Sequence, residues 1–353
     1  MTKMKKNPLS DDLDYIISKT APLWDELRNQ KIFITGGTGF FGCWLLESFI
    51  WANEKLDLKA QAYVLTRRPD DFKRKTPHLA NNDAVKLWQG DIRDFKFPEG
   101  EYPFVIHAAT EASAVLNEQN PLEMFDTVVS GTRRCLEFAR HAKTKKLLFT
   151  SSGAVYGRQP PELTHIPEEY TGAPDTMDPH WAYGEGKRCA EILCSTYSKH
   201  FGIETKIARC WAFVGPYLPL DAHFAIGNFI RDAIKGGPIV INGDGTPYRS
   251  YLYASDLAIW LWTILFSGKP CFPYNVGSRE AISIKDVASA VADSYCSQTI
   301  AVTVKRQAVP GTSVERYVPS TDRAAKDLSL EQRVLLKESL LKTLSWNILN
   351  YNK

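Results

Sequence analysis

The chain has 353 residues, of which 44% are hydrophobic and 24% charged, and its formal net charge is +3. Such a composition indicates a globular protein that can bury a large core in one large domain or in two coupled domains. Lysines and arginines are interspersed with acids and form no long basic stripe, so we do not expect nucleic acid as a partner.

The first thirty residues predict a helical extension. Apolar side chains recur there at i, i+3 and i+4, which is typical of a helix of about two to four turns. The stretch becomes acidic and polar where a signal peptide needs an apolar run, and no later stretch is long and apolar enough to span a membrane. We therefore expect a cytoplasmic protein with no membrane partner.

From residue 31, short apolar runs alternate with segments of helical periodicity. The runs are KIFIT (31–35), QAYVLT (61–66), AVKLW (84–88), PFVIHA (103–108), KKLLFT (145–150) and ETKIARCW (204–211). Strands that are apolar throughout and separated by helices predict a mainly parallel, doubly wound α/β sheet of Rossmann-like type. We place this domain at 31–211, after an extension at 1–30.

After residue 211 the chain becomes rich in glycine, proline and aromatic residues, which indicates a smaller lobe at 212–353, interleaved with the first domain and mainly substrate-binding. Within it, AIWLWTILF (258–266) predicts a packed helix, because the run is far too short to cross a membrane. The seven cysteines lack CxxC spacing, and this favours reduced thiols over disulfides or a metal site.

The stretch TGGTGFFG (35–42) lies between the first predicted strand and a helix. Gly36, Gly39 and Gly42 stand three residues apart, which allows a tight turn, close approach of backbone to a pyrophosphate, and close packing of helix on strand. A glycine-rich turn without a ligand would have the same pattern. Other features of the chain have to separate the two readings.

The end of the second predicted strand bears on the choice of dinucleotide. An acid at this position would hold the ribose of NAD, but the chain has Thr66 followed by Arg67. A guanidinium pairs with the 2′-phosphate of NADP, which a carboxylate would repel. The sequence modestly favours NADP over NAD as the cofactor.

Tyr183 and Lys187 lie four residues apart in a predicted helix and share a face. An ammonium close to a phenol stabilises the phenolate and allows the pair to exchange a proton with a carbinol. Ser152 follows the strand at 145–150, at the carboxyl end of the sheet where ligands bind. Its hydroxyl is placed to hydrogen-bond a substrate oxygen.

Together these motifs resemble the extended short-chain dehydrogenase/reductases, in their nucleotide-sugar epimerase/dehydratase group. The resemblance runs from residue 31 to about 345. It rests on TGGTGFFG, GDIRD (90–94), IHAAT (106–110), SSGAVYG (151–157), YGEGK (183–187), RCWAFVGP (209–216), GDGTPYRSYLYASDLA (243–258) and YNVGS (274–278).

The resemblance implies a nucleoside-diphosphate sugar as substrate and a role for each matching residue. Ser152, Tyr183 and Lys187 would be the catalytic set. The dinucleotide would contact Gly36, Gly39, Phe40, Phe41, Gly42, Thr66, Arg67, Asp91, Ile92, Ala108, Ala109, Thr110, Tyr183 and Lys187. The substrate would contact Thr110, Glu111, Ser152, Phe213, Arg249 and Arg316, with Arg249 matching the arginine that clamps a diphosphate.

Two positions depart from the family in a way that narrows the chemistry. The 4,6-dehydratases have an Asp-Glu pair directly after the catalytic hydroxyl residue, and the decarboxylases keep the Glu, but this chain has Gly153 and Ala154. Neither side chain can act as an acid or a base. Dehydration would then need another acid, such as Glu111.

What remains is hydride transfer at a single carbinol or ketone carbon, most often C4, by a 4-epimerase or a 4-ketoreductase. Arg67 favours the reductase, and a retained cofactor would favour the epimerase. Three alternatives stay open: a dehydratase with a non-standard acid or base, an NADPH-dependent reductase of a non-sugar carbonyl, and a catalytically silent dinucleotide-binding regulator.

Three further departures concern the helices and the substrate. Val128 and Ala212 stand where the family commonly has asparagine, so an unusual substrate is expected. Gly186 replaces a frequent serine at a position expected to be exposed on its helix. By resemblance, the helices carrying Tyr183 and EMFDTVVSGTRRCLEF (123–138) would form a homodimer interface.

Overall fold

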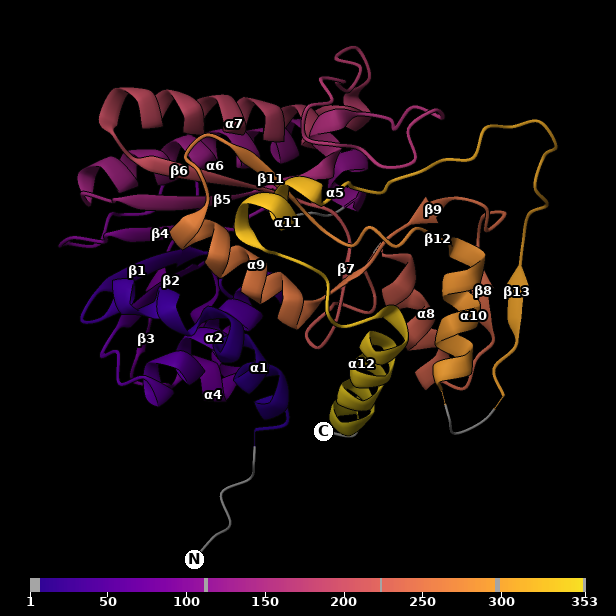
Figure 1. The fold of residues 1–353 in the computed structure, drawn as a ribbon, viewed down its shortest axis with the longest axis horizontal. Coiled ribbons are helices and arrows are strands. Elements are labelled where there is room, and N and C mark those ends of the chain that lie inside the picture. The colour runs from indigo at the N-terminus through magenta and orange to yellow at the C-terminus, as the bar shows by residue number, and fades with distance from the viewer. Residues whose placement is uncertain (1–6, 111–113, 223, 296–298, 352–353) are drawn as a thin grey trace, which may run out of the picture.

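A seven-stranded parallel sheet forms the centre of the molecule, seen in a computed structural model that describes residues 7–110, 114–222, 224–295 and 299–351 (Figure 1). The strand order is β11-β6-β5-β4-β1-β2-β3, and every neighbouring pair is parallel. The strands are β1 Lys31–Thr35, β2 Gln61–Thr66, β3 Val85–Gln89, β4 Phe104–His107, β5 Lys146–Ser152, β6 Glu204–Cys210 and β11 Pro273–Val276.

The first six strands coincide with the six apolar runs, so the predicted Rossmann-like α/β fold is confirmed. The order reverses direction between β1 and β4, and this switch point opens a crevice beyond their carboxyl ends. The seventh strand was not predicted. It lies in YNVGS, which the sequence assigned to the later lobe.

Helices cover both faces of the sheet, because side chains alternate between two separate cores. Ile32 and Ile34 of β1 point into the core beneath α2 Phe40–Lys55 and α9 Ala254–Ser267, whereas Phe33 points into the other core. That second core lies under α6 Pro121–His141 and α7 Ala182–Phe201, which run side by side (Figure 1).

Short helices complete this part of the chain. They are the 3-10 helices η1 Ala21–Leu27, η2 Gly153–Tyr156 and η3 Pro179–Trp181, and the α-helices α3 Pro69–Lys75, α4 Pro77–Ala80 and α5 Ala114–Gln119. The η2 turn directly continues β5, so it lies at the carboxyl edge of the sheet.

A smaller lobe stands beside the sheet and is built from three two-stranded pairings around its own core. The paired strands are β7 Phe213–Val214 with β10 Leu252–Tyr253, β9 Tyr248–Arg249 with β12 Ile282–Ser283, and β8 Ile239–Ile241 with β13 Val302–Val304. The helices are α8 Ala225–Ile234, α10 Ile284–Ser294 and α12 Leu336–Tyr351. The helix α11 Asp322–Leu328 packs instead against β11 and α9 of the larger domain. The domain boundaries at 30/31 and 211/212 stay predictions.

The expected N-terminal helix is α1 Ser10–Thr20, which packs against α9 and α2. Asp12 of α1 accepts a hydrogen bond from Tyr253 (2.9 Å) and pairs with Lys342 of α12, so the extension is tied to the later lobe. The predicted packed helix around Trp260 is α9, which is buried from Ala254 to Phe266. No helix in the described ranges is both long and apolar enough to cross a membrane.

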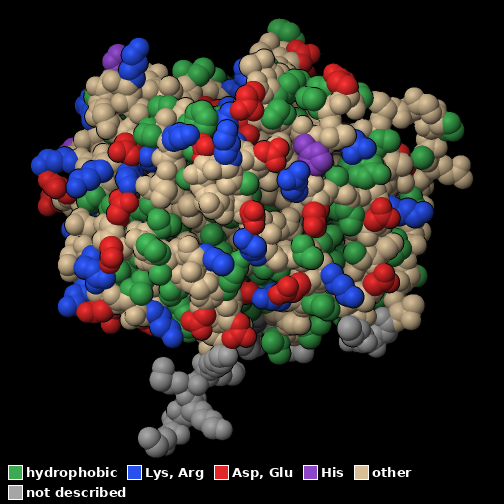
Figure 2. Space-filling model, viewed as in Figure 1, with side chains coloured by type: hydrophobic (Ala, Val, Ile, Leu, Met, Phe, Trp, Pro, Cys, Tyr) green, Lys and Arg blue, Asp and Glu red, His purple; other side chains and the backbone are tan. Residues whose placement is uncertain are grey.

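Charged side chains of both signs are interspersed over the face shown in Figure 2. Of the seven cysteines, the six in described segments are free thiols. Those segments also contain no group of three or more histidine, cysteine, aspartate or glutamate side chains placed to hold a metal ion.

Candidate active site

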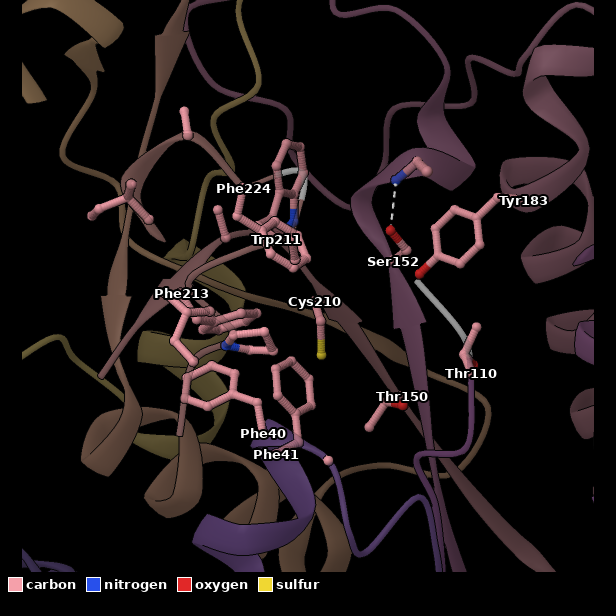
Figure 3. Close-up of a pocket in the computed structure, with 18 of the residues that line it drawn as sticks. Phe40, Phe41, Thr110, Thr150, Ser152, Tyr183, Cys210, Trp211, Phe213 and Phe224 are labelled. Carbon is pink, nitrogen blue, oxygen red and sulfur yellow. Dashed lines mark hydrogen bonds between the residues drawn. The ribbon is translucent and has the colours of Figure 1, made fainter. Parts of the chain in front are cut away.

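Ser152 ends strand β5 and caps the η2 turn. Its backbone is extended (φ −145°, ψ 152°), and its Oγ accepts a hydrogen bond from the Ala154 N–H at 3.1 Å (Figure 3). A strand that runs into a tight turn in this way holds the serine hydroxyl at the carboxyl edge of the sheet, where the crevice opens.

Tyr183 and Lys187 lie one turn apart in α7. Lys187 is 1% exposed, and its Nζ donates hydrogen bonds to Thr110 Oγ1 and to the Thr150 carbonyl oxygen, both at 2.7 Å. Its ammonium lies 5.8 Å from the centre of the Tyr183 ring. Lys187 thus joins the loop after β4, the end of β5 and the tyrosine.

Burial shifts the pKa values of this pair in opposite directions. Desolvation lowers the pKa of Lys187 from 10.5 to about 8. It raises the pKa of Tyr183 to about 12, and a hydrogen bond from the neighbouring Ser152 hydroxyl opposes that rise. In both cases the low-polarity surroundings penalise the charged form, so the state with a neutral phenol dominates before any ligand binds.

His107 holds the loop after β4 in place. Its Nδ1 lies 2.7 Å from Thr35 Oγ1 and its Nε2 lies 3.0 Å from Thr132 Oγ1, while Thr35 Oγ1 also accepts the Ala109 N–H at 3.1 Å. Burial lowers the pKa of His107 to about 3, so the imidazole is neutral. This network links β1, β4 and α6 and fixes the backbone of the loop after β4, which includes Thr110.

The glycine loop meets the backbone requirements of a dinucleotide site. Gly36 has φ +71°, and a Cβ there would lie 2.4 Å from the Ala108 carbonyl oxygen. Gly39 precedes the first residue of α2, whose initial N–H groups lack helical partners. A Cβ on Gly42 would lie 2.3 Å from the Gly37 backbone. These residues fit a bound pyrophosphate, because a pyrophosphate comes close to the backbone and accepts hydrogen bonds from backbone N–H groups.

One cavity of about 3030 Å³ joins these features. Its wall includes most of the predicted residues: Gly36, Gly39, Phe40, Phe41, Thr66, Arg67, Asp91, Ile92, Ala108, Ala109, Thr110, Ser152, Tyr183, Lys187, Phe213, Arg249 and Arg316. Gly42 does not line it and instead packs the helix against the loop. Glu111 lies outside the described residues.

A model of the NAD dependent epimerase/dehydratase family matches residues 32–277, which is more than half of the chain. The chain belongs to this family. The resemblance that the motifs indicated is thereby confirmed.

Two relatives that the chain resembles in sequence are both named UDP-glucuronic acid decarboxylases. UDP-glucuronic acid decarboxylase 6 of Arabidopsis thaliana is 29% identical over 332 residues, with 92% of each chain covered. UDP-glucuronic acid decarboxylase 1 of Xenopus tropicalis is 29% identical over 322 residues, which cover 91% of this chain and 73% of that protein.

Two solved structures have the same fold. UDP-glucose 4-epimerase of Thermotoga maritima, with UDP-glucose, has a TM-score of 0.75 at 19% identity and covers 91% of this chain and 100% of its own. The dTDP-glucose 4,6-dehydratase of Streptomyces venezuelae, with NAD and TYD bound, has a TM-score of 0.76 at 20% identity and covers 92% and 98%.

At the far end of the cavity from the glycine loop, two arginines face the crevice from the smaller lobe. Arg249 donates to the Tyr248 carbonyl oxygen (2.9 Å) and pairs with Glu315 (2.6 Å). The Arg316 guanidinium lies 4.3 Å from the centre of the Tyr248 ring. The structure therefore brings both predicted arginines onto the cavity wall, where each of them contacts Tyr248.

The prediction that Gly186 is exposed was wrong. Gly186 is buried between helices α7 and α6, and a Cβ there would lie 3.3 Å from Val128 Cβ. The glycine and the valine are complementary departures from the usual family pattern, because a serine at 186 would press against the branched side chain at 128.

Two aromatic residues of the site were not predicted. Trp211 and Tyr317 line the cavity beside Ser152, with ring centres 4.3 Å apart. Their places in the sequence gave weak signals, since Trp211 follows β6 within RCWAFVGP and Tyr317 directly follows Arg316. No local spacing rule connects either residue to Ser152.

Proposed function

We propose that this family member transfers hydride at C4 of a nucleoside-diphosphate sugar, as a 4-epimerase or a 4-ketoreductase. The observation that carries the proposal is the placement of the Ser152 and Tyr183 hydroxyls on one cavity wall with Lys187 behind them. The adjoining positions 153 and 154 hold no acid or base. Such a site can move one proton beside one carbon.

The proposed mechanism assigns a separate task to each side chain. Tyr183 takes or returns the proton of the reacting hydroxyl through its Oη. Lys187, held by Thr110 and Thr150, provides the nearby positive charge that favours phenolate as that proton moves. Ser152 hydrogen-bonds the reacting oxygen. A nicotinamide dinucleotide, when bound along the glycine loop, supplies or accepts the hydride.

The relatives named as decarboxylases and dehydratases set a contrast for this proposal. Those reactions alter C5 or C6 as well, and in the related dehydratases and decarboxylases an acidic side chain follows the catalytic hydroxyl residue. Here a Cβ on Gly153 would lie 2.6 Å from the Tyr317 hydroxyl and 2.8 Å from the Trp211 ring, so the aspartate of the dehydratases does not fit at that position. At the next position, where the dehydratases and the decarboxylases have glutamate, this chain has Ala154, which has no acidic group. The two positions together support chemistry limited to C4.

For the substrate, we propose that Arg249 and Arg316 bind the diphosphate and that Phe213 and Thr110 line the sugar or its nucleotide. Guanidinium groups bind phosphate through paired hydrogen bonds. The Glu315 carboxylate that now pairs with Arg249 is exposed, so a diphosphate can replace it without uncovering a buried charge. Glu111 stays a predicted substrate contact.

For the cofactor, we propose NADP in preference to NAD. Thr66 ends β2 in the place of a ribose-binding acid, and Arg67 and Arg68 follow it on the exposed rim of the cavity. Asp91, the nearest acid of the GDIRD motif, is already engaged by Arg93 at 2.8 Å. The rim therefore presents guanidinium groups to a 2′-phosphate.

The dimer predicted from the resemblance is also kept as a proposal. Helices α6 and α7 lie side by side on one face and carry exposed apolar residues, among them Leu122 (77% exposed) and Ile192 (66%). Light scattering on the purified protein should give twice the chain mass if the α6–α7 face pairs with a second copy, and the chain mass if it does not.

The test begins by identifying any dinucleotide that copurifies with the protein. The protein is then incubated with UDP-, GDP-, CDP- and dTDP-sugars and with their 4-keto forms, and the products are analysed by mass spectrometry. Isomerisation without net redox supports the epimerase, and reduction of a 4-keto sugar with NADPH supports the reductase. Release of carbon dioxide from UDP-glucuronate, or loss of water, would contradict the proposal.

A further inference from the structure

Trp211 lies on the cavity wall beside Ser152 and packs against two other aromatic rings. Its ring centre lies 5.9 Å from that of Tyr156, in a stacked arrangement, and 4.3 Å from that of Tyr317. A Cβ on Gly153, the residue after Ser152, would come within 2.8 Å of the indole ring. Figure 3 shows Trp211 and Ser152 on the wall of the same cavity. Sugar atoms next to an oxygen bound by Ser152 would therefore meet this indole.

Asn275 of β11 holds the indole N–H of Trp211. The N–H donates to Asn275 Oδ1 at 3.2 Å, and the Tyr156 hydroxyl donates to the same oxygen at 3.0 Å. Asn275 is fully buried and does not line the cavity, whereas Trp211 is 8% exposed and does line it. The asparagine therefore contacts the indole from within the protein and does not itself reach a substrate.

The hydrogen bonds of the Asn275 side chain fix the orientation of its amide. Its Nδ2 donates to the carbonyl oxygens of Ile166 and Ser320, at 2.9 Å and 3.0 Å. If the amide oxygen and nitrogen changed places, the oxygen would face two carbonyl oxygens and the nitrogen would face the N–H of Trp211. These hydrogen bonds would then be lost in a buried place, which is costly. The acceptor oxygen of Asn275 is thus fixed toward Trp211.

Tyr156 extends this network to helix α7. Its hydroxyl accepts from Arg209 Nη1 at 2.9 Å, and Arg209 donates two hydrogen bonds to the Glu191 carboxylate, at 3.0 Å and 2.7 Å. The arginine and glutamate side chains are 15% and 16% exposed, so the ion pair is largely shielded from solvent. Glu191 lies one helical turn after Lys187. The surroundings of Trp211 and the helix that carries Lys187 therefore belong to one buried network.

We propose that Trp211 binds the sugar of the nucleotide-sugar substrate and that Asn275 is the positioning residue that fixes its indole for this contact. This inference rests on the proposed function, because Ser152 must bind the reacting oxygen for the sugar to lie beside Trp211. An aromatic ring can cover the apolar C–H face of a sugar, and aromatic side chains commonly line small-molecule sites. A ring that is fixed before binding loses little conformational freedom when the sugar arrives. Asn275 thus contributes to affinity through Trp211.

The first test measures binding of ligands with and without the sugar. Trp211→Phe keeps an aromatic ring but removes the N–H that Asn275 accepts. The Kd of the nucleotide sugar, measured by isothermal titration calorimetry, should rise about three- to tenfold, as expected for one lost hydrogen bond. The Kd of the corresponding nucleoside diphosphate should not change, because this ligand lacks the sugar beyond the diphosphate. Equal losses for both ligands, or no loss for the nucleotide sugar, would overturn the sugar contact.

The matched control for this test is Trp262→Phe. The Trp262 indole N–H donates to Ser48 Oγ at 2.9 Å in the core beside α2, and Trp262 does not line the cavity. The variant loses an indole hydrogen bond of the same kind, so it should leave the Kd of both ligands unchanged. A nucleotide-sugar Kd raised as much as in Trp211→Phe would mean that general loosening of the fold explains both results.

A second pair of variants tests whether Asn275 acts through Trp211. Asn275→Ala should raise the Kd of the nucleotide sugar about three- to tenfold, and combining it with Trp211→Phe should add less than about twofold. A full second loss in the double variant would overturn the role of Asn275. Asn275→Asp keeps an oxygen that can accept the indole N–H, so its Kd should stay within about twofold of the wild type. If Asn275→Ala does not fold, this variant decides the question, since a Kd as high as that of Trp211→Phe would refute the role.

A measurement that needs no ligand keeps this inference distinct from the proposed function. NMR follows hydrogen exchange of the indole N–H groups, with the Trp211 resonance assigned by its loss in Trp211→Phe. Exchange in Asn275→Ala, or in Asn275→Leu if the alanine variant does not fold, should accelerate by a larger factor at Trp211 than at Trp262, which reports general loss of stability. If it does so while no nucleotide sugar binds, the proposed function and the sugar contact fail and the anchoring by Asn275 stands. Equal factors at both tryptophans refute the anchoring.

Discussion

The two ends of the cavity differ in how far apart in the sequence their residues lie. At the glycine loop, several wall residues lie within a few positions of a strand end, as Gly36 does after β1, Thr66 at the end of β2 and Ala108 after β4. At the substrate end, Gly153, Trp211 and Tyr317 come from three distant segments. The first end follows from local backbone rules, whereas the second depends on how the two lobes pack.

The largest expected effect is the loss of turnover in Tyr183→Phe, which tests whether the glycine-loop end and the substrate end form one active site. Tyr183→Phe should lower kcat by about 10²–10⁴-fold, because the group that takes or returns the proton of the reacting hydroxyl is lost. The affinity for the dinucleotide, measured by fluorescence titration, should remain close to that of the wild type. Unchanged turnover would show that Tyr183 does not exchange the proton.

The next effect tests the packing at the substrate end. Gly153→Ala should lower kcat by about 10–100-fold and the free energy of unfolding by about 1–3 kcal/mol, since the new Cβ displaces Tyr317 or Trp211. Turnover and urea unfolding measure the two quantities. Gly243→Ala, where a Cβ meets nothing within 4 Å, is the stability control and should unfold at the same urea concentration as the wild type or a higher one. A fully active Gly153→Ala variant would argue against the tight wall.

The variant Arg67→Ala tests whether the cofactor end of the cavity binds the 2′-phosphate of NADP. If Arg67 binds the 2′-phosphate, the Kd for NADP should rise by about 10–100-fold, because a charge-assisted hydrogen bond is lost. Isothermal titration calorimetry measures the change. The Kd for NAD serves as the internal control and should not change. Equal losses for both dinucleotides would mean that Arg67 does not read the 2′ position.

The last prediction concerns stability rather than turnover or binding, and it involves Lys187, which hydrogen-bonds Thr110 and Thr150. Its pKa is lowered from 10.5 to about 8 in the folded protein, so between these pH values the unfolded chain holds more protons than the native one. The cost of burying this ammonium is complete below pH 8 and disappears as pH rises toward 10.5. The unfolding free energy of the wild type, relative to Lys187→Met, should therefore increase with pH in this window when measured by urea unfolding; a flat difference would contradict the shift.

The sequence predicts the glycine-loop end of the cavity better than the substrate end. The six apolar runs predicted β1–β6, and the glycine, Tyr183 and Lys187 spacings predicted residues that the fold gathers on one cavity wall. Strand β11 was missed because it is short and lies in the later segment. Gly186 was misjudged because its burial depends on Val128 of another helix, and Tyr317 was missed because its contact with Gly153 is long-range. Helical and strand periodicity contain no information on such pairings.

The most direct test of hydride transfer at C4 uses a nucleoside-diphosphate sugar deuterated at that carbon. The substrate found in the panel is incubated with the protein and oxidised dinucleotide, and both products are examined by mass spectrometry and NMR. We expect the deuterium on the nicotinamide ring for a reductase assayed in reverse, or back at C4 of the epimer for an epimerase. Turnover that leaves deuterium at C4 with the C4 configuration unchanged, or in which the product loses a carbon or water, would contradict the account.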